Sequence, residues 1–166
     1  MSELVAAPCA DGDRTSARTA QQRGDRAERP DLGEMAGVLG VPAAEPDEAL
    51  DWFWRSRLRC ETDPYDVYHD LVAGAPGFVV LDTRRRESYD EEHVAGAVSF
   101  SHHDMTAESV TRLDPDVVYV TYGWGPGCNA GTKGAARLAA FGLRVKEMIG
   151  GIEYWKRAGY PTEKES

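Results

Sequence analysis

The sequence has few cysteines, no long apolar run and no excess of positive charge. Its three cysteines, Cys9, Cys60 and Cys128, are widely spaced and form no Cys-x-x-Cys pair. This spacing argues against a disulfide framework and against a zinc site. Apolar runs such as residues 78–81 are far too short to cross a bilayer. The sequence therefore predicts no metal site and no membrane-spanning segment.

The charge balance is acidic. The 166 residues carry a formal net charge of −9, and the pI is about 4.9. Because binding to phosphate groups needs clustered Lys and Arg, we expect no nucleic-acid partner. The first residues also lack a basic segment followed by an apolar stretch, so no secretory signal is predicted and the cytoplasm is the expected location.

The N-terminal part of the chain differs in composition from the rest. Residues 1–45 are rich in Ala, Arg, Asp, Gly and Pro, and they show no sustained apolar period. Such a composition does not offset its own ordering entropy, so we expect a disordered or loosely docked tail. Residues 46–59 predict an amphipathic helix. We expect its apolar side chains to cover a flank of the core, and the alternative is a docking surface for a partner.

Beyond residue 58, short apolar runs alternate with segments of helical character. Strands are expected at residues 58–62, 78–81, 117–122 and 145–149, with a further one between residues 93 and 100. The strand of residues 58–62 is expected at an edge of the sheet, and that of residues 145–149 is expected to be the last along the chain. Strands alternating with helices of this length are typical of an α/β domain. The predicted architecture is a mainly parallel central sheet with helices on both faces.

Residues 119–129 read as a strand, a glycine-rich loop and the start of a small-residue helix near Cys128 or Asn129. Alternating glycines allow successive backbone N–H groups to point into one concavity, and the helix adds the positive end of its dipole. Such a concavity binds an anion. Cys128 stands at its edge, where a thiol is biased toward the thiolate.

Several blocks of the sequence occur in the order of a known family. They are Asp82-Thr83-Arg84, Tyr89, residues 92–97, the loop of residues 123–129 and the segment 150–161. Over residues 58–162 the chain resembles the rhodanese family. The resemblance implies a three-layer α/β domain without a cofactor, which transfers sulfane sulfur from donors such as thiosulfate to thiophilic acceptors. In that family a loop cysteine holds the sulfur as a persulfide, cradled by backbone amides.

The chain departs from the family at the nucleophile. The family's cysteine directly follows the strand, a position that corresponds to Gly123, whereas Cys128 lies five residues later. Glycine cannot carry sulfur. Cys128 is therefore the candidate for a relocated nucleophile, and the alternative is that it packs beneath the loop as an inert small hydrophobe.

Other side chains extend this atypical active site. Asp82 and Arg84 end a buried strand, where they form either an anion-binding fork or a structural ion pair. His102 and His103 are candidates for acid–base catalysis, and on an extended segment they would point to opposite sides. The residues assigned to substrate or anion binding are Tyr122, Gly123, Trp124, Gly125, Gly127, Asn129, Asp82 and Arg84.

Three functions follow from these residues. The first is a sulfurtransferase-type enzyme that binds a small anionic or sulfur-containing donor, passes sulfur to a thiol acceptor or an acceptor protein, and uses Cys128. The second is an enzyme repurposed for acid–base chemistry on a small organic molecule in a biosynthetic pathway, in the space left at Gly123. The third is a non-catalytic module that binds an anion or a partner and presents an exposed aromatic helix carrying Trp52 and Trp54.

Overall fold

The computed structural model describes residues 43–165. Contacts within the chain separate a first unit, Met1–Ala44, from a second unit, Glu45–Ser166, and the fold described below is that of the second unit. The predicted tail of residues 1–45, including Cys9, lies outside the described residues except for its last three positions.

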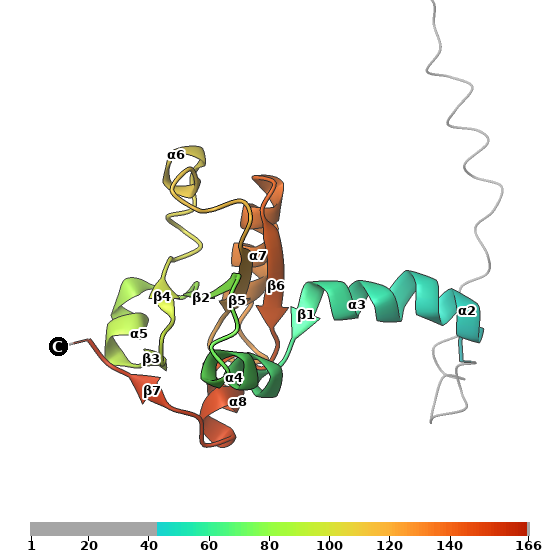
Figure 1. The fold of residues 1–166 in the computed structure, drawn as a ribbon, viewed down its shortest axis with the longest axis horizontal. Coiled ribbons are helices and arrows are strands. Elements are labelled where there is room, and N and C mark those ends of the chain that lie inside the picture. Colours follow the sequence, from blue (N-terminus) through green and yellow to red (C-terminus); the bar gives the residue numbers. More distant parts are fainter. Residues whose placement is uncertain (1–42, 166) are drawn as a thin grey trace, which may run out of the picture. The chain divides into compact units, whose positions relative to one another are not determined.

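Helices and strands alternate along the described chain, as Figure 1 shows. In order they are α2 (Pro46–Ala49), η2 (Leu50–Trp54), α3 (Arg55–Cys60), β1 (Glu61–Thr62), α4 (Pro64–Val72), β2 (Phe78–Asp82), α5 (Arg86–Glu91), β3 (His93–Val94), β4 (Val98–Ser99), α6 (Ala107–Val110), β5 (Val118–Tyr122), α7 (Ala130–Ala140), β6 (Arg144–Met148), α8 (Gly151–Arg157) and β7 (Thr162–Glu163).

Five of the strands form one parallel sheet in the order β1-β6-β5-β2-β4. In its centre, β2 and β5 pair along their full lengths, with Leu81 opposite Thr121. The parallel order confirms the predicted α/β architecture, because parallel neighbours require crossover connections such as the helices between them. The carboxyl ends of β2, β5 and β6 therefore lie at one edge of the sheet, where ligands bind in folds of this type.

Helices cover both faces of the sheet. Val80 packs into a core cluster with Val67 of α4 and Trp155 of α8. The next residue, Leu81, packs into a second cluster with Leu138 of α7 and Val110 of α6. Successive side chains of a strand point to opposite faces, so the sheet lies between two helical layers, in agreement with the predicted three-layer fold.

The helix before the sheet differs from its prediction in two ways. It runs through α2, a π-helical section η2 and α3 to Cys60, so the prediction of strand at residues 58–60 was wrong. Only Glu61 and Thr62 lie beside β6, where they pair with Glu147 and Met148. No residue of this described segment is buried, so it does not cover a flank of the core as expected.

The chain also contains a strand after the segment expected to be the last. Thr162–Glu163 forms β7, which pairs antiparallel with His93–Val94 of β3 in a separate two-stranded sheet. A strand of two residues is too short to show the alternation by which a strand is recognised in sequence. Within residues 43–165 no helix has both the length and the apolar character needed to span a bilayer.

Candidate active site

The loop between β5 and α7 is held in place by the first turn of α8. The N–H of Ile152 donates to Gly123 O at 3.1 Å, and the N–H of Glu153 donates to Trp124 O at 2.9 Å. Gly151 allows this close approach, because a Cβ at that position would lie 2.4 Å from Gly123 O. The carbonyl groups of Gly123 and Trp124, which follow β5, therefore both point toward α8.

The far half of the loop is a tight turn. The N–H of Cys128 donates to Gly125 O at 2.9 Å. Gly125 must lack a side chain, since its Cβ would lie 2.4 Å from Glu153 Oε2. Within residues 43–165, the N–H groups of Trp124, Gly125, Gly127 and Asn129 donate to no protein acceptor. The Cys128 N–H, by contrast, is used within the loop.

A cavity of about 830 Å³ opens beside this loop. Its walls include Gly123, Gly125, Gly127, Cys128 and Asn129 from the loop. Other walls come from the start of α4, from the end of β6 with its connection to α8, and from Tyr154 of α8. The cavity thus lies at the carboxyl edge of the sheet, and Cys128 of the loop is part of its wall.

The Cys128 side chain points toward the backbone of Gly123. A Cβ placed on Gly123 would lie 3.3 Å from Cys128 Sγ and 3.3 Å from Cys128 O. The cysteine is a free thiol and is partly exposed. Its sulfur therefore fills the space beside Gly123 in which a side chain at position 123 would begin.

Two carboxylates on the cavity wall were not among the predicted site residues. Glu147 Oε1 accepts a hydrogen bond from Thr132 Oγ1 at 3.0 Å, and burial raises the pKa of Glu147 above its usual value. Asp63 accepts from the N–H of Asp66 at 2.9 Å and caps α4. The lining residues in the described chain include no Lys or Arg. No sequence signal singled out Glu147, because β6 also carries the charged residues Arg144 and Lys146.

A comparison with protein-family models identifies the family of this fold. The model described as Rhodanese-like domain matches residues 65–158, which is more than half of the chain. The chain belongs to the rhodanese-like domain family. This result confirms the resemblance that the sequence motifs indicated.

Curated and structural relatives agree with this assignment. "Thiosulfate sulfurtransferase GlpE" from Coxiella burnetii is 33% identical over 87 residues, which are 51% of this chain and 76% of that protein. "Thiosulfate sulfurtransferase 16, chloroplastic" from Arabidopsis thaliana is 27% identical over 107 residues, 58% of this chain and 88% of its own. The crystal structure of the BH2092 protein from Bacillus halodurans is similar with a TM-score of 0.69 and 40% identity, covering 72% of this chain and 87% of that one.

In this rhodanese-like domain, Asp82 and Arg84 form a buried ion pair beneath the loop. Arg84 Nη2 lies 2.6 Å from Asp82 Oδ2 and also donates to Glu92 O at 2.6 Å. Both side chains are almost completely buried, and neither lines the cavity. The guanidinium is thus bound by the protein's own oxygens, which is the structural alternative considered for this pair.

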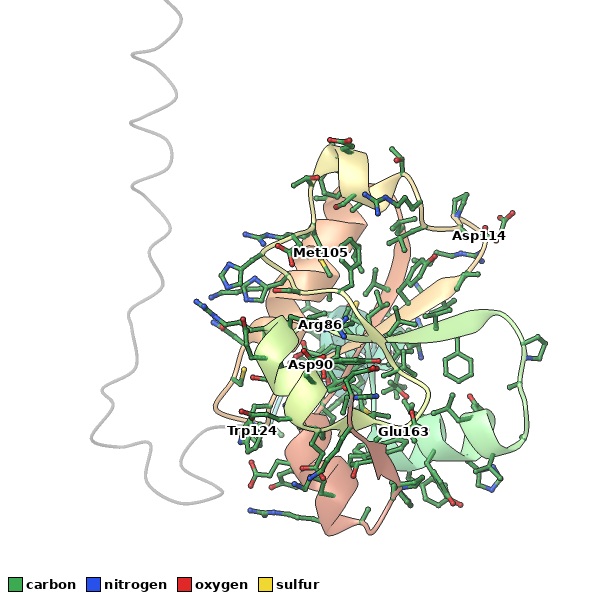
Figure 2. All side chains as sticks on the ribbon, turned by 90° about the vertical axis from the view of Figure 1, so that its left-hand side faces the viewer. Arg86, Asp90, Met105, Asp114, Trp124 and Glu163 are labelled. Atoms are coloured by element: carbon green, nitrogen blue, oxygen red, sulfur yellow. The ribbon has the colours of Figure 1, made fainter. Side chains whose placement is uncertain are left out.

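Tyr122 and Trp124 lie on either side of Gly123 but do not line the cavity. The Tyr122 hydroxyl donates to Asp82 Oδ2 at 2.6 Å. Burial, and then the charge of Asp82, raises the pKa of Tyr122, so it stays protonated. Trp124 is exposed, and Figure 2 shows it at the surface. The Arg84 guanidinium lies 5.8 Å from the centre of each ring.

His102 and His103 follow β4 in a turn, and neither lines the cavity. Their rings lie 4.0 Å apart. The expectation that they point to opposite sides was wrong, because the Asp104 N–H closes a turn onto Ser101 O instead of continuing an extended segment. Burial, and then the charges of His103 and Arg137, lowers the pKa of His102.

Within residues 43–165 no cluster of three or more His, Cys, Asp or Glu side chains is arranged to hold a metal ion.

Proposed function

We propose that this rhodanese-like protein is a sulfurtransferase in which Cys128 carries the transferred sulfur as a persulfide. The observation that carries the proposal is the 3.3 Å separation between Cys128 Sγ and a Cβ placed on Gly123. Gly123 cannot hold sulfur, and the other described cysteine, Cys60, is exposed at the end of α3. The relatives named as thiosulfate sulfurtransferases support the reaction class.

The proposed reaction has two displacements at sulfur. The Cys128 thiolate attacks the outer sulfur of thiosulfate, a new S–S bond forms, and sulfite leaves with the electron pair of the broken S–S bond. An acceptor thiolate then attacks the outer sulfur of the persulfide. The acceptor becomes a persulfide and Cys128 leaves as the thiolate, so no outside oxidant or reductant is required. We propose a thiol, free or on an acceptor protein, as the acceptor.

In this proposal the N–H groups of the loop stabilise the persulfide anion. The free N–H groups of Gly125, Gly127 and Asn129 are donors of the kind that hold a localised negative charge. Glu147, whose carboxylate lies against the first turn of α7, repels an anion in the cavity when it is ionised. Because burial raises the pKa of Glu147, a larger fraction of it is neutral than for an exposed glutamate, and its repulsion is weaker.

Persulfide formation is the direct test of this function. The purified protein is incubated with thiosulfate, and in parallel with a low-molecular-weight persulfide, and each cysteine is examined by peptide mass spectrometry. We expect one added sulfur atom on Cys128 and release of thiocyanate when cyanide is added. Cys60→Ser should behave as the wild type, whereas Cys128→Ser should lose both signals. An unmodified Cys128 with every donor would contradict the proposal.

The other two functions make different predictions in the same assay. Acid–base chemistry survives Cys128→Ser, but none of the residues assigned to it, Tyr122, Trp124 and a histidine of the pair His102 and His103, lines the cavity. A non-catalytic module would bind an anion without releasing sulfite.

The cytoplasmic location stays a prediction.

A further inference from the structure

Five large apolar side chains of the helical segment of residues 46–60 are exposed to solvent. The exposed fractions are 41% for Leu50, 77% for Trp52, 40% for Phe53, 51% for Trp54 and 73% for Leu58. An isolated helix of this length is marginally stable in water. Contiguous exposed apolar surface of this kind marks an interaction site.

The apolar side chains are arranged for packing against another helix. Leu50, Trp54 and Leu58 recur at intervals of four residues, which places them along one face of a helix. Beside this face lies a hollow of about 310 Å³ whose walls include Trp54, Leu58 and Ile149 of the same chain. The face therefore offers both a ridge and a recess.

Charge changes sign along the same segment. Its first half carries Asp47, Glu48 and Asp51, and its second half carries Arg55, Arg57 and Arg59. Two parallel copies of this segment would bring like charges together, whereas two antiparallel copies would bring each acidic half against a basic half. The charge pattern thus favours a second copy of the same chain, related by a two-fold axis.

We propose that residues 46–60 form the interface of a homodimer in which two copies of this helix pack antiparallel with Trp54 at the two-fold axis. Residues at equal distances on either side of Trp54 then lie opposite each other. Leu50 meets Leu58 of the partner subunit, at the edge of the hollow. Asp51 meets Arg57 of the partner subunit.

The ion pairs within one chain fit this arrangement. Arg57 Nη2 lies 2.7 Å from Glu61 Oε2, and Asp51 pairs with Arg55. In the dimer these two pairs join across the axis into a network, since each Asp51 gains a second arginine. This surface adjoins the cavity beside Cys128, since Asp63 and Ile149 line both hollows, but it includes no residue of the loop 123–129. Ultracentrifugation measures association and mass spectrometry measures sulfur on Cys128, so the failure of one proposal is distinguishable from the failure of the other.

Analytical ultracentrifugation of the full chain over a range of concentrations tests the proposal. We expect a dimer whose dissociation constant rises about 100-fold or more in Trp54→Glu, because a large apolar contact is lost and a charge is placed on the axis. Val72→Glu is the matched control, since Val72 is 70% exposed on α4 and lies outside the interface. A monomeric wild type, or a dimer that Trp54→Glu leaves intact, would overturn the proposal.

A charge exchange separates contacts between chains from contacts within one. Asp51→Arg and Arg57→Asp should each weaken the dimer roughly fivefold, and the double variant should recover most of the loss. Both intrachain pairs are broken in the double variant, so recovery can come only from contacts between copies. Additive weakening in the double variant would show that the copies do not pair in this way. Circular dichroism of each variant verifies that the domain stays folded.

Discussion

The sulfur of Cys128 lies beside the backbone of Gly123, in the space that a longer side chain at position 123 would enter. The Cβ of such a side chain would lie 3.1 Å from Gly131 N and 3.3 Å from Cys128 Sγ. The two positions therefore compete for one volume. A chain with a cysteine at 128 directed inward has little room for a second large group at 123.

This competition predicts the behaviour of Gly123→Cys. A Cβ at position 123 would lie 3.3 Å from Cys128 Sγ, so a sulfur atom attached to that Cβ is within reach of the Cys128 sulfur. We expect mild oxidation to link the two cysteines, with loss of two free thiols in a thiol titration. Cys60→Ser in the same background should not change this loss. Two thiols that stay free would show that Cys128 does not face Gly123.

The buried pair of Asp82 and Arg84 predicts a large effect on stability. Asp82→Asn leaves the buried guanidinium without its carboxylate, which should lower the free energy of unfolding by about 3–5 kcal/mol. Asp90→Asn breaks the exposed pair of Arg86 and Asp90, whose labels lie close together in Figure 2, and should cost less than about 1 kcal/mol. Urea unfolding of both variants gives the comparison. Equal losses would contradict the structural role of Asp82.

Glu147 predicts how stability changes with pH. Since burial raises its folded-state pKa above the ordinary 4.5, the folded protein binds the proton more tightly than the unfolded chain does. This contribution to stability is fully present below pH 4.5 and is lost as the pH rises through the folded-state pKa. Glu147→Gln lacks this titration, so its stability relative to the wild type should rise with pH. An unchanged difference between acidic and neutral pH would contradict this assignment.

At the scale of elements, α8 sets the shape of the loop. N–H groups of its first turn bind Gly123 O and Trp124 O, which fixes the direction of both carbonyls. The αL residues Gly150 and Gly151, with φ of 82° and 58°, make the turn that brings α8 to the loop. The binding properties of the loop thus depend on a helix that begins more than twenty residues later in the chain.

Gly151→Ala tests this dependence, with Gly159→Ala as the matched control. Both glycines have positive φ, but a Cβ at Gly159 meets nothing within 4 Å, whereas one at Gly151 would lie 2.4 Å from Gly123 O. The control should lose about 1–2 kcal/mol of stability from backbone strain. Gly151→Ala should lose about 1–3 kcal/mol more and should load less sulfur. If the two variants behave alike in unfolding and in persulfide loading, α8 does not hold the loop.

At the scale of the whole molecule, periodicity and motifs were sufficient for the architecture. Short apolar runs predicted the central strands, and the order of the motifs predicted the family. The strands β1 and β7 were harder to predict from the sequence. Each has two residues, and a strand of that length is defined by its pairing partner. The same holds for the helix of residues 46–60, because its apolar stripe has the same pattern whether it covers its own core or another chain.

The site shows a similar division. The glycine-rich turn and the place of Cys128 in it could be predicted, since glycine spacing and residue type are local properties, while their role in binding and catalysis stays a prediction. The sequence did not predict Glu147 as a cavity residue or the commitment of Arg84 to Asp82 and Glu92 O. Those features depend on which strands are neighbours in the sheet and on which hydrogen-bond acceptors lie near a side chain in the folded protein. Local patterns carry no information about either.

Mass spectrometry of Cys128 after incubation with a sulfane-sulfur donor tests most directly whether this domain uses a relocated nucleophile. We expect one additional sulfur atom on Cys128, which is removed by cyanide and is absent from Cys60. A protein that releases sulfite from thiosulfate while Cys128 stays unmodified, or that continues to do so after Cys128→Ser, would contradict this mechanism.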